Sequence, residues 1–443
     1  MSTDDLKSII KELKKQQDDI RTACMHYIEQ EKEVVGTNIT YHGLDGILTQ
    51  NDLPANSWVI GASWGSIAVN MSVLMDPWGE ENRMRMMFPM AEWVRLDRLL
   101  RNLGVTIQPQ MQPWEMIGVV FILCFMNGYQ FIYPWGNYVL VQPKTKPRIS
   151  VDAIDKSEHE LTLSVMLKQM AKRQSKDMAV LCIYPEAPVF SLNNFTISGN
   201  YFHSAIGRKF QKLWNDYCEH EQKYNWICDG AVFKNCEDNF ICAGGENLED
   251  IAVVFEKDRK IISPGIQNGC YPGTTMVTFN LIGEAAGYEI ETRAITMADI
   301  KKAEWGVVTE NATFLLLRGL IDPWKQEFIP VTKGSEYRFR DIFLKTFIRI
   351  KNGDSRTLGL PRLIEKADEW FPSFQDRKAY AEKGLDIKRR AFAGEAWRNI
   401  KIALPRSEVQ LKQERMQITT LYGKYWDLPK LDHMLALRKA LKR

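Results

Sequence analysis

The stretch between residues 261 and 299 constrains the fold most, because its sequence marks where each element begins and ends. An Ile-Ile-Ser-Pro segment at residues 261–264 and a Pro-Gly pair at residues 272–273 precede a helical pattern that Gly287 is placed to cap. Residues 288–295 alternate as a strand, and residues 296–299 have the pattern of a capping box, which starts another helix. Strands and helices in this alternation predict a mixed α/β fold.

Composition places the chain among ordinary globular proteins. Its 443 residues are enough for two or three domains, and 45% hydrophobic with 26% charged residues is typical of soluble folds. The net charge of +3 is too small to argue for nucleic acid binding. The longest apolar run, residues 116–126, is too short to span a bilayer, and a charged amphipathic stretch stands where a secretory signal would begin. We therefore expect neither a membrane nor a nucleic acid as partner.

The eight cysteines are scattered along the chain. They form no CxxC pair and no Cys/His cluster at the spacing of metal ligands. This pattern predicts a reduced, cytoplasmic protein without a metal site.

The chain divides into four predicted regions: an N-terminal helical extension and loop at residues 1–57, a small α/β domain at residues 58–188, a large domain with a cofactor-type cleft at residues 189–353, and a helical extension at residues 354–443. The first extension has a thin apolar stripe among many charges and is predicted to be a solvated helix. The last one is predicted to be a solvated helical tail or a dimer arm.

Periodicity also locates elements inside the small domain. Strands are predicted at residues 58–60, 67–69 and 138–141, and helices after Pro89 and at residues 114–126. Residues 144–176 are rich in charge and are predicted to be an insertion with one helix at residues 161–172.

One segment invites comparison with a known family. After an apolar run at residues 178–184, the chain has Thr196-Ile197-Ser198-Gly199-Asn200-Tyr201 and then a helical pattern. Its Gly-Asn-Tyr resembles the Lys-x-Gly-Gly-Asn-Tyr of the branched-chain aminotransferases, a group of the class IV pyridoxal-phosphate enzymes. The resemblance implies that Tyr201 contacts the cofactor ring oxygen. The lysine that forms the Schiff base falls on Thr196, and a threonine cannot form one.

Two further segments carry the resemblance and concern the cofactor phosphate. Residues 85–89 and the helix after them resemble "Arg-Leu-Phe-x-Pro, helix, Arg-Leu", which implies that Arg95 grips the phosphate, a role that suits the donor fork of a guanidinium. Residues 270–275 resemble "Leu-Pro-Gly-Ile-Thr-Arg". This implies that Thr274 and Thr275 open a helix whose first N–H groups hold the phosphate.

Two departures from the family concern the chemistry. Residues 241–248 resemble "Ser-Glu-Gly-x-x-x-Asn-Leu", and the glutamate that bonds the pyridine nitrogen falls on Cys242, whose thiol is normally neutral and a weak acceptor. Glu246 and Asn247 keep cofactor-binding positions in this segment. Where the family has Gly-Thr-Ala beside the phosphate, Asn311 follows Glu310, and the glutamate would repel a substrate carboxylate.

Three hypotheses follow, and the fold alone does not choose among them. The first is a branched-chain-aminotransferase-like protein that has lost transamination and binds a small phosphorylated ligand or an amino acid, or acts as a structural or regulatory partner. The second is an active aminotransferase for a hydrophobic amino acid and a 2-oxo acid, whose lysine lies elsewhere, the candidates being Lys209, Lys212, Lys234 and Lys257. The third is an enzyme that uses the scaffold without a Schiff base.

The first hypothesis is favoured, because transamination needs both an amine and an acid partner for the pyridine nitrogen. The resemblance covers roughly residues 58–350 and implies a two-domain α/β fold of the branched-chain (D-amino acid) aminotransferase type. It also implies a homodimer. Pyridoxal phosphate, if bound, would be held noncovalently.

Overall fold

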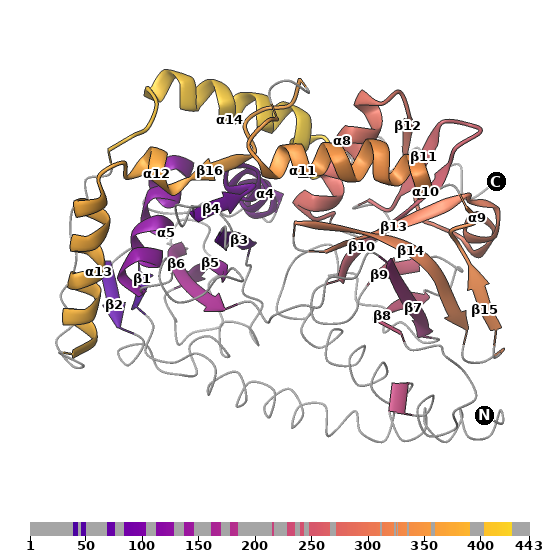
Figure 1. Cartoon of the computed structure of the whole chain (residues 1–443), viewed down its shortest axis with the longest axis horizontal. Helices are drawn as coiled ribbons and strands as arrows, with labels where there is room; N and C mark the ends of the chain where they lie inside the picture. Colours follow the sequence, from indigo (N-terminus) through magenta and orange to yellow (C-terminus); the bar gives the residue numbers. More distant parts are fainter. Residues whose placement is uncertain are drawn as a thin grey trace, which may run out of the picture.

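The structure of the chain is a computed structural model, and two β-sheets organise it (Figure 1). It describes residues 39–42, 46–49, 69–75, 84–102, 112–127, 137–145, 161–169, 178–184, 215–216, 228–234, 240–242, 248–265, 272–310, 312–322, 325, 327–334, 336–355, 359–389 and 403–427.

The first sheet is antiparallel throughout. Its strands lie in the order β16 (Ile364–Lys366), β4 (Met84–Met87), β3 (Val69–Met75), β5 (Asn137–Thr145), β6 (Leu161–Gln169), β1 (Ile39–His42) and β2 (Gly46–Thr49).

The second sheet is mixed, with parallel pairing between β11 and β12, β14 and β7, and β7 and β8. Its strands lie in the order β12 (Glu289–Thr292), β11 (Lys260–Ser263), β10 (Leu248–Phe255), β13 (Trp305–Glu310), β14 (Thr313–Asp322), β7 (Met178–Tyr184), β8 (Gly230–Lys234) and β9 (Phe240–Cys242), and β15 (Glu327–Pro330) pairs with β14.

Helices accompany both sheets (Figure 1). Those beside the first sheet are α4 (Pro89–Asn102), α5 (Pro113–Asn127), α12 (Ala367–Trp370) and α13 (Phe374–Arg389). Those beside the second sheet are α8 (Thr274–Ala285), α9 (Met297–Lys302) and the continuous run of α10 (Glu336–Arg338), the π-helical turn η3 (Phe339–Leu344) and α11 (Lys345–Lys351). The last of the helices that the structure describes, α14 (Glu408–Gly423), crosses from the side of α4 and α12 toward α8.

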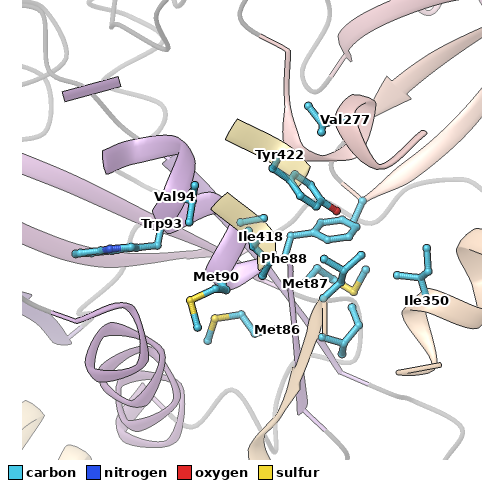
Figure 2. Packing of buried hydrophobic residues seen from close by; sticks show 14 of the residues in the cluster. Met86, Met87, Phe88, Met90, Trp93, Val94, Val277, Ile350, Ile418 and Tyr422 are labelled. Atoms are coloured by element: carbon cyan, nitrogen blue, oxygen red, sulfur yellow. The ribbon is translucent and has the colours of Figure 1, made fainter. Parts of the chain in front are cut away.

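The main hydrophobic core is shared between the two halves of the molecule. It joins α4 and α5 to α8, α11 and α14, so that both sheets contribute to one buried cluster. Figure 2 shows Ile418 and Tyr422 of α14 between Val94 of α4 and Val277 of α8. A smaller cluster, which includes Ile251, lies on the other face of the second sheet. Because side chains alternate along a strand, β10 contributes to both clusters.

Several local predictions are confirmed. The helix predicted at residues 114–126 is α5, and its apolar run is buried in the core. The predicted helix before Gly287 is α8, and Gly287 follows it with φ +82°, the left-handed conformation that favours glycine. The capping box is present, with the side chain of Thr296 accepting from the Asp299 amide and the Asp299 side chain accepting from Thr296.

The helix predicted at residues 161–172 is wrong, because residues 161–169 form strand β6 and pair with β5 along its whole length. Leu161, Leu163, Val165 and Leu167 repeat with the period of a strand. The strand predicted at residues 58–60 lies outside the described residues. Of the strand predicted at residues 67–69, only Val69 is described, and it is the first residue of β3.

The prediction of a solvated C-terminal tail is also wrong for residues 403–427. Leu411, Ile418, Tyr422 and Trp426 are each 0% exposed, because one face of α14 and the turn after it pack on the core. These positions recur with helical spacing, which is the signature of a packed helix.

The predicted domain boundaries stay predictions, but the sheets are assembled from segments that cross them. β7, placed before residue 188, pairs within the second sheet, and β16, beyond residue 353, pairs within the first sheet. Among the helices that the structure describes, none combines the length and apolar character needed to cross a membrane.

Candidate functional site

The structure describes three residues of the predicted cofactor site with their side chains: Arg95, Thr274 and Thr275. Cys242 is the last residue of β9, and its side chain is outside the description. The remaining predicted site residues lie outside the described residues: Thr196, Tyr201, Glu246, Asn247 and Asn311. Of the alternative lysines, Lys257 is exposed in the turn between β10 and β11.

The start of α8, residues 272–275, is the centre of the described site. Gly273 is the N-cap and supplies no side chain to cap the helix. A helix start carries unpaired N–H donors and a partial positive charge, so it attracts an anion. Here the anion is part of the chain, because the Gly273 amide donates to Oδ2 of Asp250 at 2.8 Å. Asp250 lies at the start of β10 and is 3% exposed.

A second carboxylate reaches the same helix start from α4. The Thr274 hydroxyl donates to Oε1 of Glu92, which is only 4% exposed. Oε2 of Glu92 lies 3.6 Å from Nη1 of Arg95, three residues further along α4. Burial raises the pKa of Glu92, against the opposing effects of the Arg95 charge and the Thr274 hydroxyl. Arg95, predicted to hold a phosphate, therefore lies beside a carboxylate of its own helix.

Thr275 is held by the loop after β13. Its hydroxyl oxygen accepts a hydrogen bond from the Ala312 amide at 3.1 Å. Ala312 has φ +54°, an uncommon conformation for a residue other than glycine. Thr275 and Ala312 are both buried, so the predicted phosphate residue Thr275 and the predicted phosphate loop are in contact with each other.

The C-terminal segment closes the site from a third side. The Thr278 hydroxyl donates to the Thr274 carbonyl at 2.7 Å, so the 2.9 Å contact with Tyr422 is a hydrogen bond donated by the Tyr422 phenol. Trp426 Nε1 donates to the carbonyl oxygen of Pro272 at 2.8 Å. Burial raises the pKa of Tyr422, and the negative charge of Glu92 adds to this effect.

Sequence reasoning missed four residues that build this site: Glu92, Asp250, Tyr422 and Trp426. Glu92 had a local signal, because it stands three residues before Arg95 on a predicted helix, which places the two side chains on one face. The other contacts join parts of the chain that no local pattern connects.

The described donors do not fit the phosphate of pyridoxal phosphate. The Gly273 amide, the Thr274 hydroxyl and Arg95 all face carboxylates of the chain, whereas the Thr275 hydroxyl accepts from Ala312 and keeps its own hydrogen to donate. Two unit charges about 4 Å apart interact by roughly 4 kcal/mol at an effective dielectric constant of about 20, so ionised Glu92 and Asp250 would strongly repel a phosphate dianion. No group of three or more metal-ligating His, Cys, Asp or Glu side chains occurs in the part of the chain that the structure describes.

Comparison with known proteins defines the class of fold. Three solved structures cover 70% to 75% of this chain and nearly all of their own. They are the branched-chain aminotransferase of Thermoproteus uzoniensis with norvaline (14% identity, 75% of this chain and 100% of that one, TM-score 0.54), that of Thermobaculum terrenum in its PLP form (13%, 75% and 99%, 0.53) and that of Escherichia coli (10%, 70% and 94%, 0.50).

The chain therefore has the mixed α/β fold of the branched-chain aminotransferases over about three quarters of its length. No family model matches the sequence. No curated protein matches it either. At identities of 10% to 14%, these similarities establish the fold and leave the activity to the site.

Proposed function

We propose that this protein is a branched-chain-aminotransferase-like protein that does not transaminate and acts as a non-catalytic structural or regulatory partner. The observation that carries the proposal is the buried Glu92 carboxylate between Arg95 and Thr274. In the resemblance to the family, these two residues serve the cofactor phosphate, and here they serve a carboxylate of the chain.

The sequence supports the same conclusion independently. Thr196 stands at the lysine position and Cys242 at the position of the pyridine-nitrogen glutamate. A threonine offers no amine for an imine and no base for the α-proton. The cofactor supplies an electron sink when it is bound, but Thr196 cannot attach it covalently, and the described start of α8 does not fit its phosphate. Loss of the lysine and of the glutamate together is more simply explained by lost transamination than by one tolerated exchange.

The version of the hypothesis in which the protein binds a phosphorylated ligand places a further demand on the site. Such a ligand would have to displace Glu92 from Thr274, or bind while Glu92 is protonated. The homodimer and the cytoplasmic location remain predictions from the sequence.

The test is incubation of the purified protein with pyridoxal phosphate, desalting, a visible absorption spectrum, and borohydride reduction followed by peptide mapping. Turnover of hydrophobic amino acids with a 2-oxo acid is measured in parallel, with an active branched-chain aminotransferase as positive control. We expect no retained absorption band, no stoichiometric lysine adduct and no turnover. A stoichiometric phosphopyridoxyl adduct on one lysine together with turnover would refute the proposal and establish the alternative, an active aminotransferase whose lysine the adduct identifies.

A further inference from the structure

Residues 403–427 contact both halves of the molecule. On the first half, Nη1 of Arg98 in α4 lies 2.9 Å from Oδ1 of Asp427. On the second half, Lys424 Nζ and the Tyr425 hydroxyl both donate to Glu284 near the end of α8. Figure 1 shows α14 crossing from one half to the other.

The N-terminal end of this segment is fixed by a buried ionic cluster around Arg406. Nη2 of Arg406 lies 2.5 Å from Oε1 of Glu365 and 3.2 Å from Oε2 of Glu414. Glu365, which is 3% exposed, also accepts from Trp370 Nε1 at 2.9 Å. Arg406 thus ties the start of α14 to β16 and α12, and breaking such a buried pair leaves an uncompensated charge.

The C-terminal end of the segment, with Tyr422 and Trp426, is fixed to the first turns of α8. Tyr422 bonds Thr278, Thr278 bonds the Thr274 carbonyl, and Trp426 bonds the carbonyl of Pro272. Tyr422 and Trp426 are both 0% exposed, so these hydrogen bonds are shielded from water.

From these contacts we infer that residues 403–427 form a strap, fixed at both ends, that holds the α8 start against Glu92 and keeps the site filled by the chain's own carboxylate. The inference rests on the proposed function, because it explains how the anion-excluding arrangement is maintained. Tyr422 is a positioning residue, since it reaches Glu92 through Thr278 and Thr274. Release of the strap would open the α8 start to solvent, where a free anion could compete with Glu92.

The test is amide hydrogen exchange on the full chain, measured by mass spectrometry without any ligand. The double variant Tyr422→Phe/Trp426→Phe removes both polar links to α8 and keeps most of the buried ring area. Loss of two buried hydrogen bonds predicts roughly 10- to 30-fold faster exchange in peptides covering residues 272–279. Lys424→Gln is the matched control, because it removes a half-exposed link from the same segment to the other end of α8.

A second variant acts at the other end of the strap. Arg406→Met should speed exchange in α14 first and in residues 272–279 as a consequence, while amides of β14 serve as the internal reference for global unfolding. In the double variant, inorganic phosphate should slow exchange at residues 272–279, and it should have no effect on the wild type.

The inference is overturned if residues 272–279 exchange at the wild-type rate in both strap variants, or if exchange rises equally in β14. Neither result depends on pyridoxal phosphate or on turnover. Failure of the strap and failure of the proposed function are therefore separate outcomes.

Discussion

Replacing Glu92 by glutamine tests whether this carboxylate excludes phosphate from the α8 start. The glutamine is nearly the same size, and its amide oxygen can still accept the hydrogen bond from Thr274, so the local packing should persist. The substitution removes the negative charge beside Arg95. Because burial raises the pKa of Glu92, its ionised form carries a desolvation cost that the variant avoids, while Arg95 loses this carboxylate partner.

The expected gain in phosphate affinity is worked from the distance between the charges of Arg95 and Glu92. Unit charges 3.6 Å apart interact by roughly 4–5 kcal/mol at an effective dielectric constant of about 20. In the wild type, a phosphate that pairs with Arg95 must displace Glu92 and break an ion pair of this order. Rearrangement of the buried segment offsets part of the gain, so we expect a net gain of about 2.8 kcal/mol, which is roughly a hundredfold decrease in Kd.

The assay is isothermal titration of inorganic phosphate into wild type, Glu92→Gln and a matched control at pH 7.5. Glu284→Gln is the control, because it makes the same chemical change on an exposed carboxylate near the end of α8. Only Glu92→Gln should bind phosphate measurably more tightly than the wild type. If its affinity equals that of the wild type and of Glu284→Gln, Glu92 does not exclude the anion and the proposed function loses its main support.

Other parts of the structure give three further predictions. Glu256→Ala should lower the free energy of unfolding by about 1–3 kcal/mol in urea titration, because it leaves the indole N–H of buried Trp305 and the hydroxyl of buried Tyr288 without their acceptor. Gly384→Ala should destabilise by about 1–3 kcal/mol, since its Cβ would lie 2.0 Å from the carbonyl oxygen of Met126; thermal unfolding at the wild-type temperature would contradict this close approach of α13 to α5. Burial lowers the pKa of Lys351 to about 8, so the folded state is penalised below that pH and the penalty vanishes above the ordinary value of 10.5. Lys351→Met should therefore be more stable than the wild type at pH 7, and the difference should shrink in unfolding titrations between pH 8 and 10.5; a constant difference would count against the shifted pKa.

Local sequence patterns predicted the elements whose ends are set by neighbouring residues. Gly287 after α8 and the capping box at Thr296 were both foreseen, because each depends on backbone geometry within a few residues. The position of Arg95 on α4 was foreseen for the same reason. Strand β6 was missed because its period-two pattern was outweighed by its charged surroundings.

The sequence by itself predicted α5, α8 with Gly287 after it, and the helix start at Thr296, and its resemblance to the aminotransferases predicts that Thr196 and Cys242 stand where the family has its lysine and glutamate. Only the tertiary structure decided what occupies the α8 start. Glu92 and Thr274 are 182 positions apart, and Thr278 and Tyr422 are 144 apart. Such pairs meet because two sheets and a C-terminal helix share one hydrophobic core, and burial is a property of the whole fold rather than of any short segment.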